Sequence, residues 1–377
     1  MIEQQRRVSP AKHNKNTHHK TRESMSPHSS NIAFNPKLEH IRALAALLVF
    51  FYHAFHHFYG SWQSFPSWPL LAIFTEGHIG VGLFFTLSGY LFMKIAISGN
   101  IDYRRFIFNR FLRIFPLFLL VFFLAISLGR DKFQPQDLLY LFISNIGKPA
   151  TSDYFVTGAA WTISIEFTFY LIFPFLALFV RQQGLVYIGR MLLIFLVLKL
   201  CVLSLAAHPA HVLQSTLIGR LDQFLIGMGF ATLALGSFFK RPYALIITTL
   251  IIISISVFRS QYAILFNESS RSFILVIWYT LEALLWGLFI YAYANTQWRL
   301  PDLIEKFLSF IGQRSYSFYL LHAMVLYLLS HYLVSDLSIP ILLGKITLAL
   351  LLSCLLADLS WRSIELPFLN LRQHYVH

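Results

Sequence analysis

Arg42 and His53 place two ionisable side chains on one face of the first apolar run. They lie 11 residues apart, which at about 100° per residue leaves them about 20° from each other and about 16 Å apart along a helix. A histidine at that depth is costly in lipid and indicates function, whereas the structural alternative is an interhelical hydrogen bond. A neutral imidazole could take the proton of a reacting hydroxyl. We therefore take His53 and Arg42 as catalytic candidates.

A cluster of four arginines precedes the third apolar run: Arg104, Arg105, Arg110 and Arg113. Guanidinium groups pair bidentately with phosphate oxygens, so the cluster indicates a phosphate clamp. Short cytoplasmic loops are also basic for topological reasons, and this explanation has equal weight. Arg110 and Arg113 are spaced i, i+3 and are expected to share a helix face.

Glu166 is a carboxylate about a turn and a half inside the fourth apolar run. It needs a cation, a hydroxyl or water beside it. It could orient an imidazolium or hold a sugar hydroxyl, and the structural alternative is a partner such as Arg220. We take it as a third catalytic candidate.

Three further polar residues are candidates for substrate binding: Arg220, Asp222 and His322. Arg220 and Asp222 open the sixth apolar run, on the same side as Glu166, and His322 lies about two turns inside the ninth. Glu282 and Asp358 stay ambiguous, because Asp358 could simply pair with Arg362. His331 and Asp336 have the His-x4-Asp spacing of glycerolipid acyltransferases, but a two-residue match arises easily by chance.

The elements that must position these residues are membrane helices. The chain of 377 residues is 56% apolar and only 12% charged, against about a quarter charged in soluble domains. Ten apolar runs are long enough to be membrane helices, so we predict an all-α polytopic protein. They lie near 41–59, 77–98, 114–129, 161–180, 191–206, 217–236, 243–258, 273–294, 315–334 and 340–361.

Basic connections alternate along the chain and share one side with residues 1–36, so both termini are predicted in the cytoplasm. Residues 1–36 are expected to be a basic disordered tail, followed by a membrane domain over 37–370 and a short tail over 371–377. The loop 130–160 should face the opposite compartment. The net charge of +13 is spread over these connections, so topology explains it better than nucleic-acid binding. Cys201 and Cys354 fall in apolar runs, and no metal site is predicted.

Six motifs, taken in order, resemble the membrane acyltransferases of family 3, which include bacterial O-antigen and exopolysaccharide acetylases. The likeness extends from about residue 37 to residue 370. The motifs are Leu38–Ala46 with His53 downstream, Gly80–Leu91, Arg110 with Arg113, Trp161–Glu166, Ser315–His322 and Glu365–Pro367. The family's Arg-x10-His motif falls on Arg42 and His53, and its Arg-x-x-Arg motif on Arg110 and Arg113.

The resemblance implies a multi-pass protein of the bacterial inner membrane that uses acetyl-CoA, or another acyl-CoA, from the cytoplasm. It implies an acceptor hydroxyl on a carbohydrate such as lipopolysaccharide or another surface polysaccharide. His53 would act as a base or as an acyl carrier, and the arginines at 104–113 with Arg42 would bind the donor phosphates. No permanently bound cofactor is expected. Larger members carry a fused extracytoplasmic domain, which we expect this chain to lack.

A different class of function also fits intramembrane His, Glu and Arg residues, namely a secondary transporter or flippase. The sequence has no internal repeat at a fixed period and no paired spans broken by Gly or Pro, features that are typical of transporters. Acyl transfer is therefore the favoured hypothesis.

Overall fold

The computed structural model describes residues 35–59, 71–128, 160–267, 270–333 and 338–377, and within these ranges the chain is helical. The predicted tail up to residue 34, the loop 130–159 and Asp336 lie outside the described residues. The longer helices are α1 (Pro36–Tyr59), α3 (Ile79–Ser98), α4 (Tyr103–Leu128), α6 (Ala160–Gln183), α7 (Leu185–Leu205), α9 (Leu217–Thr232), α10 (Pro242–Gln261), α11 (Ile274–Asn295), α12 (Asp302–Gln313), α13 (Ser315–Tyr332) and α14 (Ile339–Ser360). Short elements are α2 (Ala72–Thr75), α8 (Pro209–Ser215), η5 (Ser237–Lys240), η6 (Ala263–Phe266), η7 (Trp361–Glu365) and α15 (Leu366–Leu369).

All ten predicted apolar runs coincide with helices, so the all-α prediction is confirmed for the described residues. Among these residues, eight helices are long and apolar enough to cross a membrane: α1, α3, α4, α6, α7, α10, α11 and the continuous segment from α14 to α15. The other two predicted spans are α9, which has 16 residues, and α13, which has 18 with several Ser, His and Tyr side chains. The chain is thus a multi-pass membrane protein.

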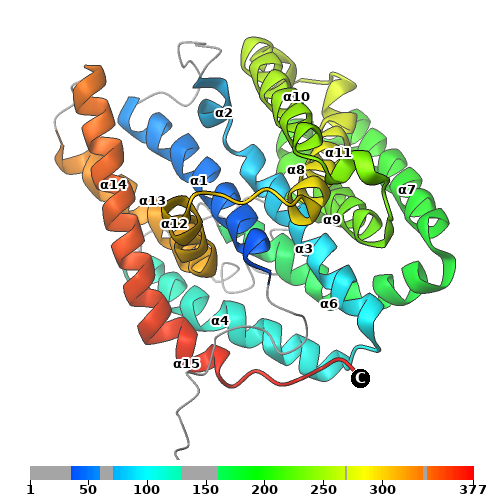
Figure 1. The fold of residues 1–377 in the computed structure, drawn as a ribbon. Helices are drawn as coiled ribbons and strands as arrows, with labels where there is room; N and C mark the ends of the chain where they lie inside the picture. The colour runs from blue at the N-terminus through cyan, green and yellow to red at the C-terminus, as the bar shows by residue number, and fades with distance from the viewer. Residues whose placement is uncertain (1–34, 60–70, 129–159, 268–269, 334–337) are drawn as a thin grey trace, which may run out of the picture.

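The helices separate into an inner group and an outer group. In Figure 1, α1 runs through the middle of the bundle, while α14 and α7 lie at opposite edges. Burial agrees with this view, because 83% of the apolar window of α3 is buried, against 11% for α7 and 22% for the span of α14. These two outer helices present leucine, isoleucine and valine outward, as expected for surfaces in contact with lipid.

Helices α3 and α9 cross in close contact at the centre of the bundle. A side-chain carbon added at Gly89 would lie 2.1 Å from the carbonyl oxygen of Phe224, and one at Gly227 would lie 2.0 Å from that of Thr86. Small residues allow this approach of two backbones, as is usual between membrane helices. The crossing holds one wall of the cavity described below.

Helix α12 was not predicted, because its first residues were assigned to a basic connection. It is a short amphipathic helix that packs beside α1, and it ends at Arg314. Arg314 donates to Asp358 at 2.6 Å, and Arg362 lies 2.9 Å from the other oxygen of the same carboxylate. The predicted Asp358–Arg362 pair is therefore confirmed, with Arg314 as a second partner.

Residues 370–377 form a strap that folds back onto the start of α4, a region predicted only as a tail. Val376 forms an isolated antiparallel bridge with Ile101. Asn109 donates its amide to Gln373 O at 2.7 Å and accepts from Gln373 N at 2.9 Å. Tyr375 is fully buried against Phe106. The chain end lies beside the start of α4 in Figure 1.

Candidate active site

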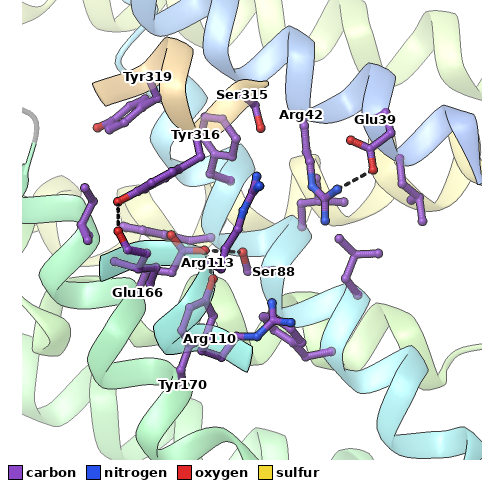
Figure 2. A pocket seen from close by; sticks show the side chains of 18 of the residues that line it. Glu39, Arg42, Ser88, Arg110, Arg113, Glu166, Tyr170, Ser315, Tyr316 and Tyr319 are labelled. Carbon is purple, nitrogen blue, oxygen red and sulfur yellow. Dashed lines mark hydrogen bonds and ion pairs between the residues drawn. The ribbon is translucent and has the colours of Figure 1, made fainter. Parts of the chain in front are cut away.

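Side chains of five of the six family motifs, which are far apart in the sequence, line one cavity of about 230 Å³ between α1, α3, α4, α6 and α13, and Glu365 of the sixth motif accepts a hydrogen bond from Arg113 of this lining. Figure 2 shows Arg42 of α1 and Arg110 and Arg113 of α4 near one another, with Glu166 and Tyr170 of α6 beside them. The polar and aromatic lining includes Glu39, Arg42, Ser88, Arg110, Arg113, Thr162, Glu166, Tyr170, Ser315, Tyr316, Tyr319, Arg372 and Tyr375. The fold therefore gathers into one place the motifs on which the resemblance depends.

The arginines of the cavity are held in different ways. Arg42 donates to Glu39 at 2.5 Å, one turn earlier in α1. Arg113 donates to Glu365 at 2.8 Å. Glu365 belongs to η7, a single π-helical turn of the kind often found at functional sites, and it also accepts from Ser317.

Arg110 lies among aromatic faces. Its guanidinium carbon is 5.0 Å from the ring centre of Phe92, 5.6 Å from Phe106 and 5.7 Å from Tyr170, within the range of cation–π contact. Among the described residues, its buried Nε has no hydrogen-bond partner and no carboxylate forms an ion pair with it. A guanidinium in such surroundings has donors to offer a bound anion.

Glu166 is held by hydroxyl groups. Ser88 donates to its Oε1 at 3.2 Å, and Tyr170, one turn later in α6, donates to the same oxygen. The alternative partner considered from the sequence, Arg220, instead donates its Nε to Gln214 O at 2.7 Å. Glu166 thus lies in the same cavity as the arginines without an arginine as its hydrogen-bond partner.

His53 and His322 form a direct imidazole pair. Nε2 of His322 lies 3.0 Å from Nδ1 of His53, and Nδ1 of His322 lies 2.6 Å from Tyr319 O. A carbonyl oxygen only accepts, so Nδ1 of His322 donates to Tyr319 O. Nδ1 of His53 likewise donates to Val49 O, 2.9 Å away, and shares this proton with Nε2 of the neutral His322 ring. His53 then carries its lone pair on Nε2.

Tyr319 links the imidazole pair to the cavity. It lines the cavity, and its ring centre lies 5.9 Å from that of His322. Its hydroxyl accepts from Thr162 at 3.0 Å. Arg42 therefore lies in the cavity near the start of α1, whereas His53, nearer the end of the same helix, belongs to the neighbouring imidazole pair.

The remaining predicted residues lie away from the cavity. Arg104 and Arg105 are exposed at the start of α4, where Arg105 contacts Asp102 and donates to His374 O of the strap. Arg220 is buried with its guanidinium carbon 3.8 Å from the ring centre of Tyr279. Asp222 forms a buried ion pair of 2.6 Å with Lys199.

A second polar group, not predicted from the sequence, lies near His53. The Tyr52 ring is 5.1 Å from His53 and 5.3 Å from His78. Glu76 lies 3.6 Å from Nδ1 of His78 and 3.2 Å from Nε of Arg259. Burial, together with Arg259 and Arg220, lowers the pKa of His78 well below its usual value. Neither ring nitrogen of His78 has a hydrogen-bond partner among the described residues.

Comparison with known proteins decides the family. A family model described as an acyltransferase domain matches residues 35–358. The chain belongs to acyltransferase family 3. The resemblance seen in the sequence is thereby confirmed.

Two curated relatives of this chain illustrate the family. The O-acetyltransferase OatA of Staphylococcus aureus is 28% identical over 379 aligned positions, covering 88% of this chain and 57% of that protein. The acyltransferase MdmB of Streptomyces mycarofaciens is 34% identical over 160 positions, covering 39% of this chain and 40% of that protein. The chain spans little more than half the length of OatA. No solved structure matches it.

The family match ends before two side chains that bear on the arginine-lined cavity. Arg372, which lines the cavity, and Glu365, which pairs with its Arg113, both lie beyond residue 358. Glu365 could be found from the Glu-Leu-Pro motif. Arg372 had no such signal, because a lone arginine near a chain end fits topological anchoring equally well.

Proposed function

We propose that this acyltransferase transfers an acetyl group from cytoplasmic acetyl-CoA to a hydroxyl of a cell-surface carbohydrate, in the bacterial inner membrane. The observation that carries the proposal is the cavity in which Arg42, Arg110 and Arg113 meet, joined through Tyr319 to the His53–His322 pair. Such a site suits a molecule that carries phosphates at one end and a reactive carbonyl at the other.

The donor end of the proposal depends on the arginines. Coenzyme A carries several phosphate charges, and guanidinium groups bind phosphate oxygens in bidentate geometry. Arg110 offers donors that no carboxylate among the described residues occupies. The basic connections of this end support a cytoplasmic position for it.

The chemical step depends on Nε2 of His53. As a base, Nε2 takes the proton of the acceptor hydroxyl while the hydroxyl oxygen attacks the thioester carbonyl; the carbon–sulfur bond breaks and the thiolate leaves. As an acyl carrier, Nε2 itself attacks the thioester carbonyl and the thiolate leaves; the acceptor hydroxyl then attacks the acetyl carbonyl, the bond to Nε2 breaks, and the freed imidazole takes the hydroxyl proton. Both routes use the tautomer that Val49 O and His322 favour at Nδ1 of His53.

The acceptor end of the proposal depends on the polar group near His53. Tyr52, His78, Glu76 and Arg259 offer donors and acceptors suited to sugar hydroxyls, and they adjoin His53 on the side away from Arg42. OatA is named an O-acetyltransferase, which supports an oxygen acceptor, and the family resemblance supports a carbohydrate.

The test is transfer of labelled acetyl from acetyl-CoA in membrane vesicles. His53→Ala should lower the transfer rate by about 10²-fold or more, because general base catalysis contributes about 10²–10⁴-fold. His331→Ala, at an exposed position near the end of α13, is the matched control and should keep the rate. Normal transfer by His53→Ala would exclude this histidine, and substrate movement without thioester consumption would favour the transporter.

A further inference from the structure

The strap places one more arginine in the cavity. Arg372 lines the cavity together with Arg42, Arg110 and Arg113, although its segment comes after the last membrane helix. The strap is fixed to α4 by the reciprocal Asn109–Gln373 hydrogen bonds and by buried Tyr375. Arg372 is therefore held in place by the fold of its own segment.

The surroundings of Arg372 are unfavourable for a positive charge. Burial, together with repulsion from Arg113, Arg110 and Arg42, lowers its pKa to about 10. Glu39 and Glu365 already pair with Arg42 and Arg113. Like charges gathered in a partly buried cavity are costly unless an anion joins them.

We propose that Arg372 binds a phosphate group of the acyl donor, so that the strap is part of the donor site. This inference rests on the proposed function, because it takes the donor to be a coenzyme A thioester. It assigns a binding role to a residue outside the part of the chain that the family model matches. If Arg372 were only structural, it would act through contacts within the protein, among them the hydrogen bond from its Nε to Leu369 O, which measures 2.9 Å.

Donor kinetics test the proposal directly. Arg372→Gln should raise the KM for acetyl-CoA by roughly 10- to 100-fold with little change in kcat, since a charged hydrogen bond of this kind is lost. Arg372→Lys should restore part of the affinity. The matched control is Arg362→Gln, which removes the same charge from a residue that is 66% exposed and paired with Asp358; its KM should stay near that of the parent protein.

A second variant moves the strap without removing a charge. Asn109→Ala deletes the reciprocal hydrogen bonds to Gln373 and should also raise the KM for acetyl-CoA. Ser363→Ala, an exposed residue that bonds only within its own helix, is the control.

Direct binding of free coenzyme A, measured by calorimetry on the purified full chain, distinguishes a failure of this inference from a failure of the proposed function. Weaker coenzyme A binding in Arg372→Gln supports the inference even if the parent protein transfers no acetyl, a result that would refute the proposed function alone. An active parent protein whose Arg372→Gln variant keeps both KM and coenzyme A affinity overturns the inference alone. An equal loss in Arg362→Gln would also overturn it, because the effect would then be one of overall charge.

Discussion

The His53–His322 pair shows how one side chain sets the protonation of another. Tyr319 O fixes the proton of His322 on Nδ1, and this leaves Nε2 to accept from His53. Val49 O, which lies 2.9 Å from Nδ1 of His53, favours the same tautomer, so both contacts leave the lone pair of His53 on Nε2, the nitrogen proposed to react. Such outer partners commonly fix the tautomer of a functional histidine.

His322 substitutions test this role by their ranking. His322→Gln keeps a side-chain oxygen that can accept from Nδ1 of His53, whereas His322→Ala leaves Val49 O as the acceptor. We expect kcat to fall about 10-fold in the Gln variant and further in the Ala variant, with the KM for acetyl-CoA unchanged in both. Equal losses in the two variants, measured by acetyl transfer, would contradict a role of His322 as acceptor for His53.

At the residue scale, the sequence could predict which side chains share a helix but not what they contact. The 3.6-residue period placed Arg110 and Arg113 on one face, and both line the cavity. His53 and Glu166 each have one partner four residues away in their own helix, but His322 lies 269 residues from His53, and Ser88 lies 78 residues from Glu166. Such contacts depend on how helices pack, which no local pattern encodes.

At the element scale, the α3–α9 crossing determines the position of a cavity wall. Phe85 of α3 stacks on Phe224 of α9 with ring centres 4.7 Å apart, and Phe224 stacks on Phe169 of α6 at 4.0 Å. Three helices are thereby held together by one aromatic stack. Gly89 and Gly227 permit it by letting the two backbones approach.

Gly227→Ala should destabilise the protein. The added carbon would lie 2.0 Å from a backbone oxygen, and overpacking of this kind costs about 1–3 kcal/mol. Gly189→Ala in α7 is the matched control, because nothing lies within 4 Å of that position; the change should be neutral or stabilising by up to about 1 kcal/mol. Thermal unfolding in detergent measures both, and equal midpoints would refute a tight crossing.

Apolar length predicted the long helices well, because a span must satisfy its own backbone in lipid. The same signal could not find α12 or the strap. Helix α12 has an exposed face over Leu303, Ile304 and Phe307, and the strap is held by side-chain bonds to Asn109. The position of each depends on contacts with residues far away in the sequence, which come together when the spans pack.

At the scale of the whole molecule, the bundle has two chemically different ends. The arginine cavity adjoins the start of α1, and the His78 group adjoins its end. The positive-inside rule predicts the first of these in the cytoplasm. This orientation is what would bring donor and acceptor to His53 from opposite sides.

Cysteine labelling tests the predicted orientation. After Cys201 and Cys354 are replaced by serine, Gln182→Cys should react with a membrane-impermeant maleimide only in inverted vesicles. Gln261→Cys should react only in right-side-out vesicles, because exposed Gln182 and Gln261 lie at the ends of α6 and α10. The reverse pattern would place the arginine cavity outside the cytoplasm.

The position of Arg42 and His53 on one continuous helix sets a length requirement on the donor. They are 11 positions apart in α1, a rise of about 16 Å, and a helix does not shorten to suit its ligand. If Arg42 binds the donor phosphates and His53 acts on its carbonyl, as proposed, the donor would carry these two groups about that far apart. Acetyl phosphate, in which the charge and the carbonyl are adjacent, would then be too short to reach both, however strongly it is activated.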